Sequence, residues 1–174
     1  QNYDQTLNQW DYRAPRKASL ILKSFNKVNP KKILDLACGT GLFAEELIKI
    51  YPKTKIDGVD ISKKIITIAR SKKIYNNLIC ANFDKKFATF YKYDLISCIG
   101  AMTYTNNPKK LLQSVHNKLK NSGFFIFSHR VDLIIKQNFI KMLEDFSNRW
   151  NVYYISRPIL YLPNNKDFKN KIKI

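Results

Sequence analysis

Apolar positions along this chain follow two patterns. Short, nearly continuous apolar runs bounded by turn residues predict buried strands, because a strand covered on both faces loses its alternation of polar and apolar positions. These runs cover residues 32–36, 55–60, 77–80, 93–100 and 124–128. Elsewhere, apolar residues recur every three or four positions and predict amphipathic helices.

The predicted helices carry start signals. Pro15 and Pro108 suit a first helical turn, where the amide that proline lacks is not needed, and the Ser62 hydroxyl can cap a helix. Helices are expected from residues 15, 42, 63 and 108 onward, and over 133–146. Two further strands are predicted at 150–155 and 171–174, with a proline-bounded loop between them.

Strands that alternate with helices predict an α/β domain with an open, mostly parallel sheet, because parallel neighbours need crossover connections. A length of 174 residues suits a single domain with a sizeable core. We expect residues 30–174 to form this core and residues 1–29 to form a helical region that caps it.

Residues 33–45 predict a buried strand, a glycine turn and the start of a helix. Gly39 and Gly41 allow a tight turn and close approach of a ligand to the backbone. With Ala44 as a third small residue and Asp60 about 20 residues further on, the spacing fits the fingerprint of dinucleotide-binding sheets. On this pattern alone, NAD and S-adenosylmethionine both remain open.

Asp35 favours S-adenosylmethionine. A carboxylate at the end of the first strand would repel a pyrophosphate, whereas S-adenosylmethionine carries an ammonium and a sulfonium that an acid attracts. The length of the chain also leaves no room for the second domain of most dehydrogenases.

The sequence ILDLACGTG at 33–41, followed by DGVDIS at 57–62, resembles motif I and the acidic loop of class I S-adenosylmethionine-dependent methyltransferases. The resemblance implies a Rossmann-like, doubly wound, mostly parallel sheet of about seven strands with helices on both faces and an antiparallel last strand. In that family the last strand belongs to a hairpin, and we expect this chain to stop within it, short of a tail.

The resemblance also assigns contacts to the cofactor, whose product is S-adenosylhomocysteine. Asp60 would accept hydrogen bonds from the two ribose hydroxyls, Ile61 would pack on the adenine, and Asp35 would support the ammonium directly or through water. The methionine end would lie along the backbone of Ala37, Gly39, Gly41, Ile99 and Gly100.

The adenine contact departs from the family pattern. The family usually places an acid after the third strand, where this chain has Asn82, whose amide oxygen can still accept a hydrogen bond. Asp84 is the substitute if the register is shifted. Phe83 is expected to stack on the base.

Residues 10–15, WDYRAP, resemble the lead-in of small methyltransferases related to the Williams-Beuren-region methyltransferase-like protein. In such proteins an N-terminal helix closes over the cofactor. The resemblance therefore predicts that Arg13 pairs with the cofactor carboxylate and that Tyr12 lines the pocket.

Methyl transfer from a sulfonium is an in-line displacement, so a base is needed only if the acceptor must lose a proton. His129 is the first candidate base and Tyr104 the second, although a lone histidine is more often structural. The signatures of amino-nitrogen and base-carbon methyltransferases are absent. A small-molecule acceptor is therefore expected beneath a group of ring side chains: Trp10, Tyr12, Tyr104, His129 and Tyr161.

The net charge of +18 keeps a nucleic-acid partner open. Lysine supplies 25 of the 31 basic residues and is scattered, whereas nucleic-acid readers more often cluster arginine, so this partner is not favoured. The alternatives are an RNA or protein methyltransferase that uses the basic surface, and a non-catalytic S-adenosylmethionine-binding module.

Three cysteines without metal-ligand spacing indicate buried thiols in a reducing compartment, and no metal site is expected. There is no apolar run long enough to span a membrane, and the polar start does not resemble a signal peptide. We therefore expect a cytoplasmic monomer or homodimer that does not contact membranes.

Overall fold

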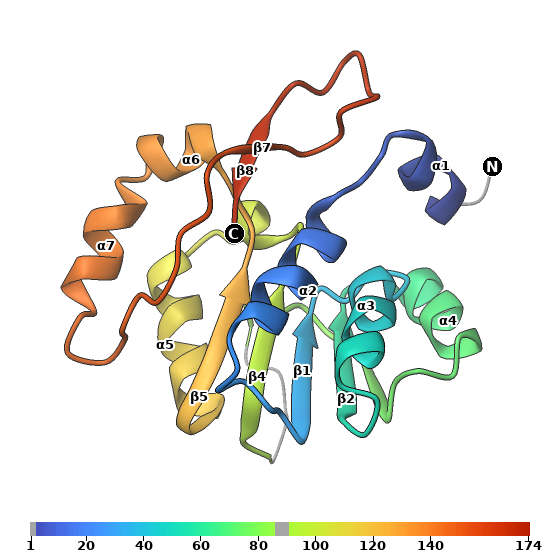
Figure 1. The fold of residues 1–174 in the computed structure, drawn as a ribbon, viewed down its shortest axis with the longest axis horizontal. Helices are drawn as coiled ribbons and strands as arrows, with labels where there is room; N and C mark the ends of the chain where they lie inside the picture. The colour runs from blue at the N-terminus through green and yellow to red at the C-terminus, as the bar shows by residue number, and fades with distance from the viewer. Residues whose placement is uncertain (1–2, 86–90) are drawn as a thin grey trace.

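A five-stranded parallel sheet forms the centre of the computed structural model, which describes residues 3–85 and 91–174 (Figure 1). The strand order is β3-β2-β1-β4-β5, and each neighbouring pair is parallel. The order changes direction between β1 and β4, which is where ligands bind in open sheets of this kind. The strands are β1 (Lys32–Leu36), β2 (Lys55–Asp60), β3 (Asn77–Cys80), β4 (Tyr93–Cys98) and β5 (Leu119–Phe127).

Alternate residues of the central strands build two cores. Ile33 packs with helices α2 (Ala14–Ser24) and α3 (Leu42–Ile50), whereas Leu34, on the other face, packs with helix α5 (Pro108–Lys118). Helix α4 (Lys63–Ser71) contacts β2 and β3, at the β3 edge of the sheet. The expected cover on both faces is confirmed, since a parallel sheet buries both of its faces.

A small antiparallel sheet joins distant parts of the C-terminal half. Its order is β6-β8-β7, with His129 opposite Lys173 and Ile159 opposite Ile172. The expected antiparallel last strand is therefore confirmed, but the strands divide into two sheets instead of one sheet of about seven. The three strands are β6 (His129–Arg130), β7 (Ile159–Leu160) and β8 (Lys171–Lys173).

Two predictions about the elements after β5 are wrong. Residues 150–155 contain no strand; the rings of Trp150 and Tyr153 lie beside β5 instead, with centroids 6.2 Å from Phe125 and 5.8 Å from Phe124. The helix predicted over 133–146 is two helices, α6 (Val131–Lys136) and α7 (Phe139–Asp145). Asn138 separates them in a left-handed conformation, with φ of 48°, that no α-helix can include.

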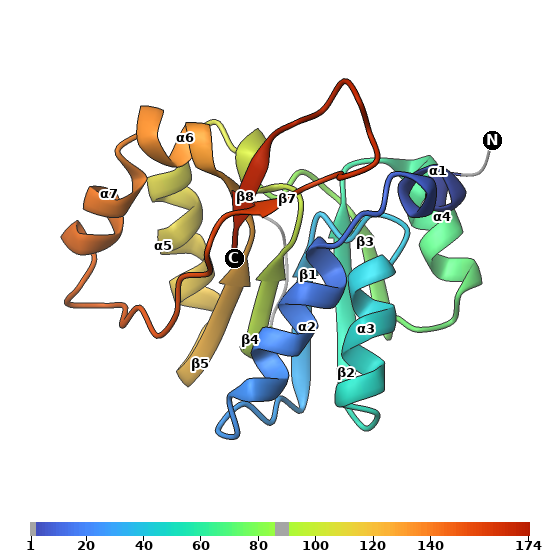
Figure 2. The same cartoon turned by 45° about the horizontal axis from the view of Figure 1, so that its top comes forward.

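The carboxyl ends of the parallel strands point toward one end of the molecule. In Figure 2 this end comes forward, and helix α1 (Tyr3–Gln9), the loop between β7 and β8, and the short helix η1 (Met102–Tyr104) gather there. The bounds of helix α1 were not predicted within the expected N-terminal helical region, and residues 1–2 of that region lie outside the described residues. Segments from both ends of the described chain thus lie near the ends of the strands.

Candidate functional site

The turn after β1 follows a left-handed path. Ala37, Gly39 and Gly41 have φ of 51°, 55° and 96°, and the Gly41 amide donates to the Cys38 carbonyl at 3.0 Å. A Cβ at Gly39 would meet nothing within 4 Å, whereas one at Gly41 would lie 3.1 Å from the ring of Tyr75. The turn therefore has open space beside Gly39, where a ligand can approach its backbone.

Asp60, at the end of β2, faces this turn. Its Oδ2 accepts a hydrogen bond from the Gly39 amide at 3.0 Å, and its Oδ1 accepts one from the Ser62 amide at 2.9 Å. Ser62 is the N-cap of α4, as predicted, with its hydroxyl accepting from the Ile65 amide. Each carboxylate oxygen can accept a further hydrogen bond, so Asp60 can still receive two vicinal hydroxyls.

Ile61 follows Asp60 and is 66% exposed, unlike the buried residues that precede it in β2. An exposed isoleucine is unremarkable alone, but here it stands beside a fixed carboxylate and an open glycine turn. Together these three features fit the ribose and the adenine of S-adenosylmethionine.

Asp35 is the third residue of interest. It lies in β1, just before the turn, and its side chain is buried. Its Oδ1 accepts from the Ser97 hydroxyl at 2.7 Å, and its Oδ2 accepts from the Tyr75 hydroxyl at 2.9 Å. Burial raises the pKa of Asp35 to about 6, the two hydroxyls oppose that shift, and the nearby Asp60 adds to it. A buried carboxylate next to a ligand-accessible turn is suited to a cationic partner.

Gly100 ends the path of β4 with φ of 84°, and its amide donates to the Ser128 hydroxyl at 2.7 Å. A Cβ here would lie 2.5 Å from the Tyr12 hydroxyl and 3.0 Å from the Tyr161 hydroxyl. The rings of Tyr12 and Tyr161 meet edge to face at 5.1 Å. Tyrosines from the N-terminal and C-terminal segments thus cover this strand end, where a small cavity of about 40 Å³ also reaches Tyr104.

Helix α1 is fastened to the same region through one carboxylate. Asp4 accepts a short hydrogen bond from the Thr40 hydroxyl and forms an ion pair with Lys72 at 2.7 Å. Lys72 also pairs with Glu45 of α3 at 2.9 Å. These contacts hold α1 beside the glycine turn.

In the structure, Arg13 and the residues predicted near the adenine contact other groups of the protein. Arg13 is half exposed and donates to Asp11 at 2.6 Å, so its pairing with a cofactor carboxylate stays a prediction. Asn82 uses its amide oxygen to accept from the Asp84 amide at 2.8 Å, and Phe83 packs against the core. Asp84 accepts from the Asn106 amide at 2.7 Å and thereby ties down the loop after β4.

The two candidate bases differ in accessibility. His129 is 1% exposed, its Nε2 lies 3.1 Å from Gln137 Oε1, and its ring meets that of Phe139 at 4.8 Å. Burial lowers the pKa of His129. Tyr104 is 75% exposed. Neither role is tested by the geometry, but only Tyr104 presents its side chain to solvent.

Ile99, by contrast, is buried in the core beside α2 and α3, so only its backbone is available to a ligand.

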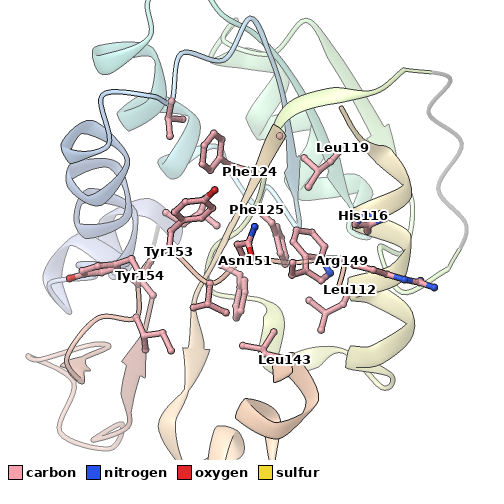
Figure 3. Close-up of a pocket in the computed structure, with 18 of the residues that line it drawn as sticks. Leu112, His116, Leu119, Phe124, Phe125, Leu143, Arg149, Asn151, Tyr153 and Tyr154 are labelled. Atoms are coloured by element: carbon pink, nitrogen blue, oxygen red, sulfur yellow. The ribbon is translucent and has the colours of Figure 1, made fainter. Parts of the chain in front are cut away.

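A much larger cavity, of about 1060 Å³, lies elsewhere (Figure 3). It runs between β5 and residues 149–155, with Phe124, Phe125, Leu112 and Tyr153 among its walls. Among its lining residues in the described chain there are several lysines and no acidic side chain. Apolar walls with cationic groups suit a cationic cofactor poorly, so the glycine turn is the better candidate site.

Sequence reasoning missed several residues that shape the site. Tyr75, Ser97 and Asp4 reach it from separate segments, so no spacing along the chain brings them together. Ser97 gave one signal, since it is a polar residue within the apolar run of β4. Within the described ranges, no group of three or more His, Cys, Asp or Glu could hold a metal, and no helix could cross a membrane.

The family model for a methyltransferase domain matches residues 27–171. The malonyl-acyl-carrier-protein O-methyltransferase of Bacillus cereus is 27% identical over 129 residues, which cover 73% of this chain and 48% of that protein. The chain spans about half the length of the curated relatives it first matches.

Solved structures agree on the fold. An S-adenosylmethionine-dependent methyltransferase from Clostridium acetobutylicum superposes with a TM-score of 0.61 and 27% identity, over 73% of this chain and 54% of that one. A plantazolicin methyltransferase, solved with a pentazolic desmethylPZN analogue and S-adenosylhomocysteine, gives a TM-score of 0.69 at 23% identity, over 89% and 71% of the two chains.

The strand order and the glycine turn between two acids define a class I S-adenosylmethionine-dependent methyltransferase fold. The chain belongs to the methyltransferase domain family.

Proposed function

We propose that this chain binds S-adenosylmethionine at the turn after β1 and transfers its methyl group to a small-molecule acceptor near Gly100. The observation that carries the proposal is the open space beside Gly39, directly against the fixed carboxylate of Asp60. That pairing offers backbone to the methionine end and a hydrogen-bond acceptor to the ribose.

The roles of the residues follow from their positions. Asp60 holds the ribose hydroxyls, and each charge-assisted hydrogen bond contributes roughly 1.5 to 3 kcal/mol. Ile61 packs on the adenine through its exposed face. Asp35 attracts the ammonium. When bound, the cofactor supplies a methyl group on a positively charged sulfur.

The residues around Gly100 orient the acceptor. Tyr12 and Tyr161 exclude water from the end of β4, and the exposed Tyr104 borders the same small cavity. Holding acceptor and donor in line in a dry site supplies much of the rate. An anionic acceptor oxygen needs no base, which is compatible with the buried position of His129.

A small acceptor suits these dimensions, because tyrosines cover Gly100 and the adjoining cavity is small. The similar proteins include enzymes named for acyl-carrier-protein and plantazolicin substrates, so acceptors vary among relatives. Because several curated relatives are named as O-methyltransferases, the proposed acceptor is a small molecule with an oxygen nucleophile.

Calorimetry with S-adenosylmethionine, S-adenosylhomocysteine and NAD tests the proposal. We expect the first two to bind saturably, and Asp60→Ala to weaken their binding by about tenfold or more, since it removes a charged acceptor for two hydroxyls. Asp167→Ala is the matched control, because Asp167 is an exposed acid in the loop between β7 and β8. Saturable binding of NAD alone would refute the assignment.

Two alternatives give different results in the same experiments. A non-catalytic module would bind the cofactor but would release no S-adenosylhomocysteine with any acceptor. An RNA methyltransferase would bind RNA tightly, with affinity that falls steeply as salt rises.

A further inference from the structure

Tyr75 occupies a central position that the roles above do not use. It lies in the connection between α4 and β3, and its ring passes between β2 and the glycine turn. A Cβ at Gly58 would lie 2.8 Å from Tyr75 Cε1, and one at Gly41 would lie 3.1 Å from Tyr75 Cε2. Glycine at both positions therefore leaves room for this ring.

The ring delivers its hydroxyl to Asp35. Tyr75 donates to Oδ2 at 2.9 Å while Ser97, directly opposite Asp35 in the β1–β4 register, donates to Oδ1 at 2.7 Å. Burial raises the pKa of Tyr75 well above its usual value, so this hydroxyl keeps its proton and remains a donor. Each carboxylate oxygen of Asp35 is thus held by a hydroxyl from a different segment.

Hydrogen bonds of this kind favour the charged form of a carboxyl group, whereas burial favours the neutral form. These opposing effects leave the pKa of Asp35 raised to about 6, close to neutral pH. Other titratable groups also act on Asp35 or respond to its charge, and they come from several packed segments: Asp60, Cys38, Cys98 and Tyr12. Of these, Asp60 opposes the charged form of Asp35.

We propose that Tyr75 is a positioning residue for the methyl donor: its hydroxyl keeps the Asp35 carboxylate charged and fixed in place for the donor's ammonium. This inference rests on the proposed function for the identity of the ligand. The effect of the Tyr75 hydroxyl on Asp35 does not depend on it. Tyr75 acts through Asp35 and does not itself contact the reacting atoms.

The first test needs no ligand. The Asp35 carboxyl carbon is followed by NMR from pH 4 to 8 in the wild type, Tyr75→Phe and Tyr51→Phe. The wild-type midpoint is expected near 6, and Tyr75→Phe should raise it by about one pH unit, because a donor to the charged form is lost. Tyr51→Phe is the matched control, since Tyr51 donates to the Leu22 carbonyl and touches neither acid.

The second test separates positioning from packing. Tyr75→Phe should weaken S-adenosylmethionine about fivefold at pH 6 and hardly at pH 8, as a one-unit shift in the midpoint requires. The neutral 5′-methylthioadenosine lacks the ammonium and should bind the variant and the wild type equally. Phenylalanine keeps the ring over Gly41 and Gly58, so the fold is preserved; Ser97→Ala should shift the midpoint in the same direction.

An unmoved Asp35 midpoint in Tyr75→Phe overturns the proposal. So does equal weakening of both ligands at both pH values, which would assign Tyr75 a packing role alone. If the wild type binds neither ligand, the proposed function fails, while the NMR titration still decides the role of Tyr75.

Discussion

Gly100 combines a left-handed backbone with a crowded environment. Its φ is 84°, and the Tyr12 hydroxyl occupies the space where a Cβ would stand. Gly100→Ala should therefore lower the free energy of unfolding by about 2 to 3 kcal/mol, of which roughly 1 to 2 reflects the left-handed backbone. Urea denaturation of the variant measures this change.

Gly39→Ala is the control for Gly100→Ala, because Gly39 is left-handed too but has open space at the Cβ position. It should show only the backbone part of the loss. Tyr12→Phe combined with Gly100→Ala should recover much of the remainder by removing the clashing hydroxyl. Equal losses in both single variants would contradict the close approach of Tyr12.

His129 makes stability depend on pH. Its folded pKa lies below its usual value because of burial, so the unfolded chain binds the proton more readily. The free energy of unfolding should therefore fall as pH drops from about 6.5 through the lower folded pKa, and His129→Gln should abolish that part of the fall.

Denaturation of His129→Gln and the wild type at pH 5 to 8 measures this part as a difference. The difference is needed because Asp35, whose pKa is raised, gains stability as pH falls through about 6 and opposes the trend. A difference that does not change with pH would show that His129 is protonated as easily in the folded protein as in the unfolded chain.

At the scale of single residues, the sequence predicted the site residues that lie close together along the chain. The glycine turn with Asp35, and the β2 end with Asp60, were predicted because strand, turn and acid lie together in the chain. Tyr75 and Asp4 were not, because only the packed fold brings them to the turn. His129 was predicted as a candidate base, but the sequence could not show that Phe139 and Gln137 would enclose it.

Among the elements, α1 depends on a few polar contacts for its place. Asp4→Ala removes the hydrogen bond from Thr40 and the ion pair with Lys72. Asp4 and Lys72 are partly exposed but Thr40 is buried, so the free energy of unfolding should fall by only about 1 to 2 kcal/mol, the cost of leaving the Thr40 hydroxyl without its acceptor. Amide hydrogen exchange in residues 3–9 should nevertheless accelerate, since α1 is too short to be stable unattached.

Asp132→Ala is a suitable comparison, because its ion pair with Arg130 spans only two residues and fastens no distant element. It should leave exchange in α1 unchanged. Unchanged exchange in Asp4→Ala as well would mean that apolar contacts such as buried Leu7 hold α1 in place.

The same scale explains where element prediction succeeded. The first three strands match their predicted bounds because turn residues flank each short run, although no residue of β3 is buried. Residues 150–155 show the limit: apolar residues can line a groove beside β5 without pairing with it, and sequence pattern cannot distinguish the two. The break at Asn138 likewise depends on a backbone angle that the apolar spacing conceals.

For the whole molecule, a net charge of +18 sets the long-range behaviour. If the charge serves no nucleic-acid partner, binding to single-stranded RNA at physiological salt should be weak, with little sequence preference. Filter binding or fluorescence anisotropy measures it at 50 and 200 mM salt. Tight binding that falls by orders of magnitude across this range would favour the RNA alternative.

The outer edge of β5 has a consequence of its own. Within the described chain no strand pairs with that edge, and exposed Tyr153 and Val152 flank the groove beside it. Unpaired backbone amides and carbonyls can pair with a strand of a second molecule. Repulsion between the positive net charges of the two molecules opposes this association. Counter-ions should weaken that repulsion, so light scattering should rise with added sodium chloride at fixed protein concentration. Val152→Lys should reduce this salt-dependent association.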